Sequence, residues 1–301
     1  MDDEDLEHDN LPSAREDAHH AEHVPPTPQT RSASYRLAFA DPEFLLREEL
    51  RPVRLQLELL KPELELQARR IESTIVVFGS ARIPEPEQAQ VDLEHAVAAA
   101  AAGPDDPALA ERVRAAERVL RRSRYYEEAR RFARIVSLAG QAQGAKQYVV
   151  VTGGGPGIMA AANRGAHEVG ALSIGHNITL PHEQAPNVWT TPELSFQFHY
   201  FALRKMHFMM RARALVVFPG GYGTLDELFE TLCLIQTGKS SPMPVLLFDQ
   251  AYWRRIIDFQ ALVEEGMIGP GDADLFSYVE TAEEAWELIR AHYELPPGDP
   301  C

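Results

Sequence analysis

Three apolar segments of this chain are each followed at once by a glycine-containing turn and then by a segment with helical spacing. The apolar segments are Thr74–Phe78, Tyr148–Thr152 and Ala214–Phe218. Strands that are apolar at every position are typical of a parallel sheet buried on both faces. Their alternation with helices predicts a Rossmann-like, doubly wound α/β fold, with helices on both faces of a parallel sheet.

Further segments extend this alternation to the end of the chain. Additional strands are expected near Leu172–Leu180, Phe196–Phe201, Pro244–Phe248 and Phe276–Val279, the second being a short aromatic strand or turn. Helices are expected after Gly157, at Leu203–Arg211, after Thr224, at Trp253–Glu265 and at Ala282–His292. Because ligands of open α/β sheets bind beyond the carboxyl ends of the strands, the three glycine turns are expected to line one crevice.

Composition divides the chain into three expected parts. Residues 1–35 hold nine acidic residues against two Arg and few large apolar groups, which is typical of a disordered acidic tail. Residues 36–72 have the apolar spacing of a helical extension. Residues 73–295 are expected to form the Rossmann-like nucleotide-binding domain, with a helical insertion at about residues 84–125.

The overall charge and the cysteine content exclude several classes of function. With 29 Lys and Arg against 45 Asp and Glu, the net charge of −16 disfavours binding to nucleic acid, which depends on basic groups. Two cysteines, Cys233 and Cys301, do not suggest a disulfide framework, so a cytoplasmic protein is expected. No apolar run has transmembrane length, the acidic N-terminus does not resemble a signal peptide, and no His or Cys spacing indicates a metal site.

The motif Pro219–Glu227 carries the strongest functional signal. It joins a buried strand to a helix, and its glycines allow an anion to approach the backbone closely. The N–H groups and the dipole at the start of such a helix favour a phosphate. Thr224 and Glu227 also have the spacing of a capping box, so Glu227 is either a helix cap or an acidic group of the site.

The turn Gly153–Gly157 has two open interpretations. With the residues that follow, it fits the loose dinucleotide pattern G-x-G-x-x-A, but the acidic residue expected about 20 positions later is missing. It is also not a Walker A loop, because no Gly-Lys-Ser/Thr closes it. A plain structural turn and a phosphate-binding turn both remain open, while an oxidoreductase that uses NAD(P) is disfavoured.

Arg204 and Lys205 lie in the helical segment that precedes the strand Ala214–Phe218. Such a pair is most often a solvated basic face. An Arg in a site binds phosphate or hydroxyl groups with two parallel hydrogen bonds, but it does not act as a general acid.

Together these motifs resemble those of the Lonely Guy (LOG) family. The motifs that carry the resemblance are Gly79-Ser80, Gly153–Met159, Arg204-Lys205 and Pro219–Glu227, in the order of the family. The resemblance extends from about Ile75 to about Ile289. Members of this family are cytokinin riboside 5′-monophosphate phosphoribohydrolases, and some also act on AMP. Many relatives were once labelled lysine decarboxylases, a label we reject because the sequence offers no clear lysine site for pyridoxal phosphate.

The resemblance implies a set of site residues. Arg204 and Glu227 correspond to the catalytic pair, with Arg204 positioning the substrate and keeping the carboxylate ionised. The phosphate-binding loop corresponds to Gly220–Thr224. The substrate-binding residues that it implies are Gly79, Ser80, Gly154, Gly155, Gly157, Met159, Glu183, Lys205, Gly220, Gly221, Tyr222, Gly223 and Thr224.

The implied reaction is hydrolysis of the N-glycosidic bond of a purine nucleoside 5′-monophosphate, giving free base and ribose 5-phosphate without a cofactor. The substrate would be AMP or an N6-modified cytokinin riboside monophosphate, the latter in cytokinin biosynthesis. The long N-terminus and the insertion are similar to the larger bacterial branch, which favours AMP or another purine monophosphate. The family also implies a homodimer or a higher homo-oligomer. The alternative is a non-catalytic carrier of a nucleotide or of the molybdenum cofactor on the same fold.

Overall fold

The computed structural model describes residues 11–181 and 185–295 and divides the chain into two compact units, Met1–Arg69 and Arg70–Cys301. The described part of the first unit is helical. Its elements are α1 (Ala14–Glu22), η2 (Ala33–Tyr35), η3 (Ala38–Ala40), α2 (Pro42–Leu45), η4 (Glu48–Leu50) and α3 (Arg51–Ala68), where η marks a 3₁₀ helix.

Helix α1 lies in the segment that composition predicts to be a disordered tail. Ser13 and Glu16 form a capping box, in which each side chain accepts a hydrogen bond from the backbone of the other, at 3.2 and 2.7 Å. No residue of α1 is buried. The helix is therefore stabilised by its local cap and not by a core, a feature that overall composition does not reveal.

The second unit contains a sheet of seven parallel strands. They are β1 (Thr74–Phe78), β2 (Val149–Thr152), β3 (Ser173–Ile178), β4 (Ser195–Phe198), β5 (Ala212–Val217), β6 (Val245–Phe248) and β7 (Ser277–Val279). Their order is β4-β3-β2-β1-β5-β6-β7, and every pair of neighbours is parallel. This topology confirms the expected Rossmann-like fold. The strand order reverses between β1 and β5, and that switch point is where ligands bind in such sheets.

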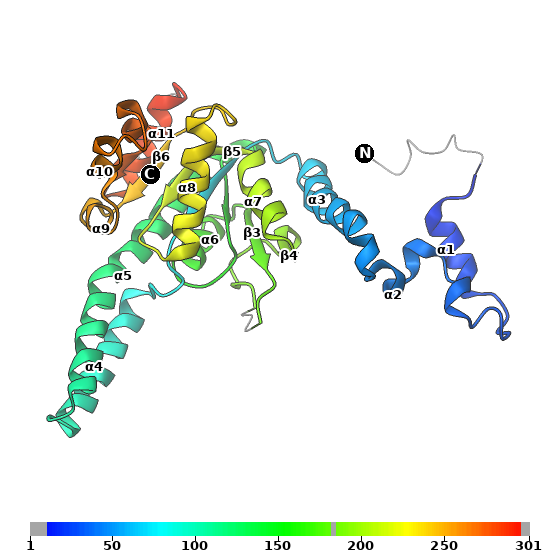
Figure 1. Cartoon of the computed structure of the whole chain (residues 1–301), viewed down its shortest axis with the longest axis horizontal. Helices are drawn as coiled ribbons and strands as arrows, with labels where there is room; N and C mark the ends of the chain where they lie inside the picture. The colour runs from blue at the N-terminus through cyan, green and yellow to red at the C-terminus, as the bar shows by residue number, and fades with distance from the viewer. Residues whose placement is uncertain (1–10, 182–184, 296–301) are drawn as a thin grey trace. The chain divides into compact units, whose positions relative to one another are not determined.

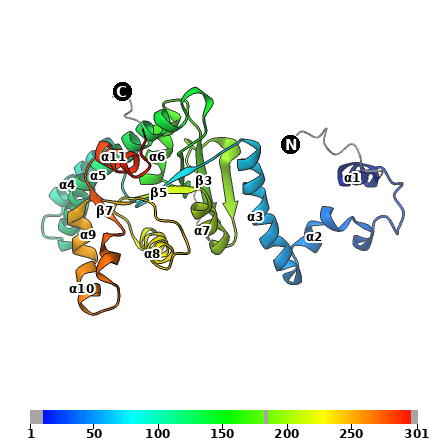
Figure 2. The same ribbon diagram turned by 90° about the horizontal axis from the view of Figure 1, so that it is seen from above.

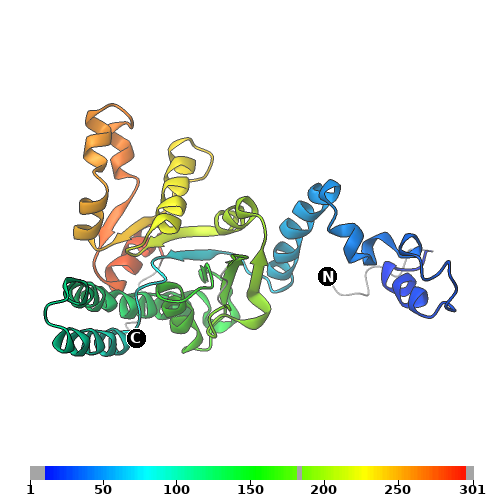
Figure 3. The same cartoon turned by 60° about the horizontal axis from the view of Figure 1, so that its bottom comes forward.

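Helices cover both faces of the sheet, as Figures 2 and 3 show. One face carries α5 (Pro107–Gly140), α6 (Ile158–His167) and α11 (Ala282–His292), and the other carries α7 (Phe201–Met210) and α8 (Tyr222–Gln236). The remaining elements are α4 (Pro86–Ala102), η5 (Ala142–Gly144), η6 (Pro192–Leu194), α9 (Gln250–Ile256), α10 (Phe259–Glu264) and η7 (Pro270–Asp274). The strands β1, β2, β5 and β6 are buried at nearly every position and form the core with α5, α6 and α11.

The insertion between β1 and β2 forms a hairpin of two helices (Figure 1). Helix α4 packs along the first half of α5, where no residue before Ser123 is buried. From Ser123 onward α5 packs against the domain, and it continues unbroken to Gly140. The hairpin is thus an extension of a helix that covers the sheet.

The segment Trp253–Glu265, expected as one helix, forms the two helices α9 and α10. The break falls at Ile257 and Asp258, and the Asp258 carboxylate accepts a hydrogen bond from the Ala261 N–H at 2.9 Å. A new N-cap inside an apolar pattern explains the error, because the periodicity continues across the break. Among the described residues, none of the helices combines the length and the apolar composition needed to cross a membrane.

Candidate active site

A cavity of about 800 Å³ lies at the carboxyl ends of β1, β2, β3 and β5, where the strand order reverses. All three glycine turns contribute to its wall, which confirms that they line one crevice. The predicted site residues that line it are Gly79, Ser80, Gly155, Met159, Arg204, Gly220, Gly221, Tyr222, Gly223 and Thr224. Gly154, Gly157, Lys205 and Glu227 are described residues that do not line it, and Glu183 lies outside the described residues.

The start of α8 contributes to the wall of this cavity. The helix begins at Tyr222, and its N-cap Gly221 provides no side chain to cap it. The first N–H groups of a helix have no partner within the helix, so those of Tyr222, Gly223 and Thr224 are available to an anion. A Cβ at Gly220 would overlap the Thr224 side chain, so the turn requires glycine there.

The capping box expected from Thr224 and Glu227 does not form. Because α8 begins at Tyr222, Thr224 is the third residue of the helix and not its N-cap. The Glu227 side chain therefore has no capping role. Two glycines before the helix allowed it to start earlier than the capping pattern indicated.

Backbone hydrogen bonds tie the three turns together. The Ser80 N–H donates to the Pro219 carbonyl at 3.0 Å, and the Ile158 N–H donates to the Ser80 carbonyl at 3.2 Å. Gly157 has a φ of +68°, and a Cβ there would overlap the Ser80 carbonyl oxygen. Gly157 therefore shapes the site by allowing close contact between two turns.

Arg204 on α7 faces Glu227 on α8. Their closest atoms, Arg204 Nη2 and Glu227 Oε1, are 3.8 Å apart, and the side chains are 13% and 6% exposed. The Arg204 guanidinium also lies over the rings of Phe201 and Phe208, at 4.9 and 5.9 Å from their centroids. Arg204 Nε and Glu227 Oε1 are buried without a hydrogen-bond partner among the described residues. The pair thus has unused hydrogen-bonding capacity beside the cavity.

Burial decides the protonation of Glu227. Loss of solvent raises the pKa of its carboxyl group, while Lys205 and Arg204 lower it by a smaller amount, so that the pKa reaches about 7. The expected effect of Arg204 has the right direction, but the cost of burying the carboxylate exceeds it. Burial likewise lowers the pKa of Arg204, against the attraction of Glu227 and Asp226.

Lys205 holds α7 and α8 together instead of lining the cavity. Its ammonium group forms ion pairs with Asp226 and Glu230, at 2.9 and 2.8 Å. Burial lowers the pKa of Lys205, but the hydrogen bonds that its ammonium group donates to Glu230 and Asp226 outweigh this effect, and the net shift is upward. A direct contact between Lys205 and a substrate remains a prediction.

Sequence analysis missed Tyr252 on α9. Its ring lines the cavity, and its hydroxyl donates a hydrogen bond to the Gly220 carbonyl at 2.6 Å. The guanidinium of Arg122 on α5 lies 5.4 Å from the centroid of the same ring. Tyr252 follows a strand that carries no motif, so the sequence offered no signal for it.

The variant Tyr252→Phe tests whether the hydrogen bond to Gly220 fixes the loop Gly220–Thr224, which is predicted to bind phosphate. Removing the hydroxyl leaves the Gly220 carbonyl without its partner, so we expect a loss of about 1 kcal/mol in nucleotide binding. Isothermal titration with AMP measures it. Tyr35→Phe is the matched control, because Tyr35 is 56% exposed and does not line the cavity. Equal affinities in both variants would contradict a positioning role for Tyr252.

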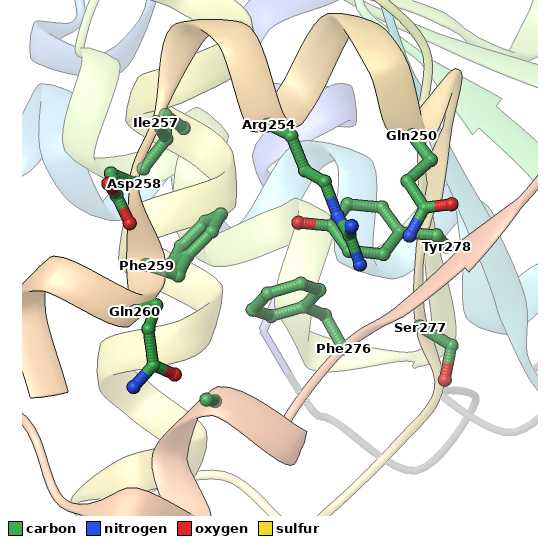
Figure 4. Close-up of a pocket in the computed structure, with 10 residues that line it drawn as sticks. Gln250, Arg254, Ile257, Asp258, Phe259, Gln260, Phe276, Ser277 and Tyr278 are labelled. Atoms are coloured by element: carbon green, nitrogen blue, oxygen red, sulfur yellow. The ribbon is translucent and has the colours of Figure 1, made fainter.

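A second cavity, of about 840 Å³, lies between α9, α10, η7 and β7 (Figure 4). The Arg254 guanidinium lies over the Tyr278 ring, 5.6 Å from its centroid, beside the Phe276 side chain. None of the site residues predicted from sequence lines this cavity. The cavity at the β1–β5 switch point is therefore the candidate active site.

The proteins to which this chain is similar agree with the resemblance that its sequence motifs indicate. The family described as "Possible lysine decarboxylase" matches residues 159–289. Cytokinin riboside 5′-monophosphate phosphoribohydrolase LOG3 of Arabidopsis thaliana is 28% identical over 152 residues, which cover 50% of this chain and 68% of that protein. Probable cytokinin riboside 5′-monophosphate phosphoribohydrolase LOG4 of Oryza sativa subsp. japonica is 29% identical over 139 residues, covering 45% of this chain and 59% of the relative.

Among solved structures, the molybdenum cofactor binding protein of Rippkaea orientalis is similar to this chain with a TM-score of 0.40 and 19% identity. The match covers 56% of this chain and 88% of that protein. The family match over residues 159–289 includes Arg204 and Glu227. The chain is thus similar to this family over residues 159–289 and to LOG phosphoribohydrolases over about half of its length.

Proposed function

We propose that the protein hydrolyses the N-glycosidic bond of a purine nucleoside 5′-monophosphate and releases free base and ribose 5-phosphate. One observation carries the proposal. A buried Arg204–Glu227 pair, with polar atoms that lack hydrogen-bond partners among the described residues, lies beside a helix N-terminus that suits a phosphate. The names of the relatives support the same type of reaction.

The phosphate would bind the N–H groups of the first turn of α8. Glu227 follows on the same helix, three residues after Thr224, about 4.5 Å further along the axis at 1.5 Å per residue. The phosphate anchor and the carboxylate are thus held by one rigid element. Binding energy from the phosphate, which does not react, would hold the ribose in place for the reaction.

The chemistry would follow that of other glycosidic cleavages. As the C1′–N bond breaks, the bonding electrons leave with the base and C1′ gains positive charge. The Glu227 carboxylate would stabilise that charge or orient the water whose oxygen bonds to C1′, and that water loses one proton while the departing nitrogen of the base gains one. Arg204, which lines the cavity, would hold hydroxyl groups of the ribose through charged hydrogen bonds.

The description "Possible lysine decarboxylase" does not fit the lysine beside this site. A lysine that forms a Schiff base is activated by a lowered pKa, as happens in an apolar pocket or next to other cations. Lys205 has the opposite environment, because Asp226 and Glu230 hold its ammonium group and raise its pKa. Lys205 also does not line the cavity.

Incubation with AMP, isopentenyladenosine monophosphate and adenosine tests the proposal. We expect free base from at least one of the two nucleotides. We expect turnover of adenosine to be lower by at least about tenfold, because adenosine lacks the phosphate that α8 would bind. Release of base from adenosine at the same rate would contradict the phosphate anchor. A nucleotide that binds tightly and is recovered intact would instead support a carrier.

A further inference from the structure

We propose that the second cavity, between α9, α10, η7 and β7, binds a small aromatic carboxylate, with the carboxylate on Arg254 and the aromatic ring against Phe276. None of the site residues predicted from sequence belongs to this cavity. Its volume of about 840 Å³ lies within the range of small-molecule sites, roughly 300 to 1,000 Å³. The inference goes beyond the proposed hydrolysis and does not depend on it.

Aromatic side chains form one wall of this cavity. The Phe276 ring contacts those of Phe259 and Tyr278, at centroid distances of 4.5 and 5.4 Å. All three residues line the cavity, and Phe276 and Tyr278 are only partly buried. Binding sites for small molecules are lined mainly by apolar and aromatic side chains, with a few polar groups that fix the orientation. A planar apolar ring is therefore the group that suits this wall.

Arg254 places a positive charge in a fixed position beside the aromatic wall (Figure 4). Its guanidinium lies over the Tyr278 ring, 5.6 Å from the centroid. With the Gln250 amide oriented so that its oxygen faces Arg254, that oxygen accepts hydrogen bonds from Nη2 at 2.8 Å and from Nε at 3.1 Å. The opposite orientation would set amide N–H groups against guanidinium N–H groups. A ring on one face and an amide on one edge thus hold the guanidinium.

The charge of Arg254 is not neutralised by a carboxylate of any residue that the structure describes. Asp258 also lines the cavity, but its Oδ1 accepts a hydrogen bond from the Ala261 N–H and caps α10. A guanidinium has five N–H donors, so Gln250 and the Tyr278 hydroxyl do not exhaust them. A carboxylate accepts two parallel hydrogen bonds from such a group, and this pairing is stronger than one between neutral groups.

The position of the charge relative to the wall limits the class of ligand. The guanidinium lies against the aromatic wall itself, 5.6 Å from the centroid of one of its rings. The anionic group of a ligand whose ring packs on Phe276 therefore has to be close to that ring. A carboxylate attached directly to an aromatic ring meets this condition, whereas the phosphate of a nucleotide is separated from its base by the ribose. The geometry thus favours an aromatic carboxylate over a nucleotide.

Helix α9 separates this cavity from the candidate active site. Gln250 and Arg254 are four residues apart and line the second cavity, whereas Tyr252 lines the first. At about 100° per residue, Tyr252 lies about 200° from Gln250 around the helix axis. The buried Trp253 fixes the helix, because its Nε1 donates a hydrogen bond to the Phe248 carbonyl at 2.8 Å. A ligand on Arg254 would therefore occupy a site distinct from the one proposed for a nucleotide.

Titration with 2-naphthoate and with its neutral amide, 2-naphthamide, tests the inference. The two probes have nearly the same shape and differ in charge. We expect the folded protein to bind 2-naphthoate at least about fivefold more tightly, because its carboxylate forms charged hydrogen bonds with Arg254. The exposure of Arg254 to water limits this preference. Ligand-observed NMR measures both dissociation constants.

Three variants locate the bound probe. Arg254→Gln removes the charge and keeps a polar side chain, so the ratio of the two affinities should fall to about one. Arg255→Gln is the matched control, because Arg255 is the neighbouring exposed arginine of α9 and does not line the cavity. Arg82→Gln removes an arginine from the wall of the first cavity. Both of these variants should keep the ratio of the parent protein, and circular dichroism with thermal unfolding establishes that each variant is folded.

Equal affinities of the folded parent protein for the two probes would overturn the inference. An unchanged ratio in Arg254→Gln would overturn it as well, and so would a loss of the preference in Arg82→Gln, which would place the probe in the first cavity. If 2-naphthoate does not bind the folded parent protein at millimolar concentration, the site itself is refuted. None of these results depends on the release of base from a nucleotide, so failure of this site is distinguishable from failure of the proposed function.

Discussion

Replacing Glu227 by Gln is expected to abolish base release and, at the same time, to stabilise the protein at about pH 8. Burial raises the pKa of the Glu227 carboxyl group from 4.5 to about 7, so the folded state disfavours its ionised form. At 1.36 kcal/mol for each pKa unit, ionisation costs up to about 3 kcal/mol of folding free energy. Gln has nearly the same shape as a protonated Glu and avoids that cost.

The stability gained by Glu227→Gln should increase as the pH rises. Between about pH 4.5 and pH 7 the folded protein keeps a proton on Glu227 that the unfolded chain has released, so stability falls as the pH rises. The variant should therefore match the parent protein at about pH 4 and exceed it above about pH 7. Urea denaturation at both pH values measures the difference. A variant that is less stable than the parent at about pH 8 would contradict the burial cost.

Activity should depend on the same ionisation in the opposite sense. If the carboxylate stabilises positive charge at C1′, the active form is the ionised one, and kcat/KM should rise with pH through about 7. Stability and activity would then change in opposite directions across one pH range. This opposition is the expected consequence of keeping a carboxylate buried for function.

The second large effect is expected from Gly157→Ala. Gly157 and Gly170 have nearly the same φ, +68° and +70°, but Gly157 combines it with a ψ of −131°, which lies outside the left-handed helical region. A Cβ at Gly157 would overlap the Ser80 carbonyl oxygen, whereas a Cβ at Gly170 would meet no atom within 4 Å. Gly170→Ala therefore reports the cost of a positive φ alone, about 1 kcal/mol, whereas Gly157→Ala adds both the strain of its ψ and the overlap with Ser80.

We expect Gly157→Ala to lower the free energy of unfolding by at least about 2 kcal/mol more than Gly170→Ala does, because it separates the first two turns. Chemical denaturation of both variants gives the difference. Nucleotide affinity should also fall in Gly157→Ala, since the Ser80 N–H bonds to Pro219 and links all three turns. Equal losses of stability in the two variants would show that the turns do not depend on this close contact.

The sheet and the glycine turns could be predicted from sequence because each leaves a local pattern. Strand β1 is predicted with its observed bounds, since all five of its residues are apolar or tolerated in a buried strand. The start of α8 could not be predicted, because its Gly221 N-cap uses no side chain while Thr224 and Glu227 imitate a capping box. The Thr224–Glu227 spacing is present, but the helix begins three residues earlier than it predicts.

The chemistry of the site depended on features that sequence does not carry. The pKa of Glu227 follows from how deeply α7 and α8 bury it, and no local pattern encodes that depth. Tyr252 and Asn177 reach the cavity from α9 and β3, which are separated along the chain from the motifs. Motifs thus identified the loop and the charged pair, whereas tertiary packing supplied the residues that complete the wall.

Product analysis of AMP with the full chain tests the central claim most directly. The proposal predicts adenine and ribose 5-phosphate in equal amounts from the parent protein, and no detectable adenine from a folded Glu227→Gln variant that still binds AMP. AMP and isopentenyladenosine monophosphate that are both recovered intact from the folded parent protein would contradict the proposed hydrolysis.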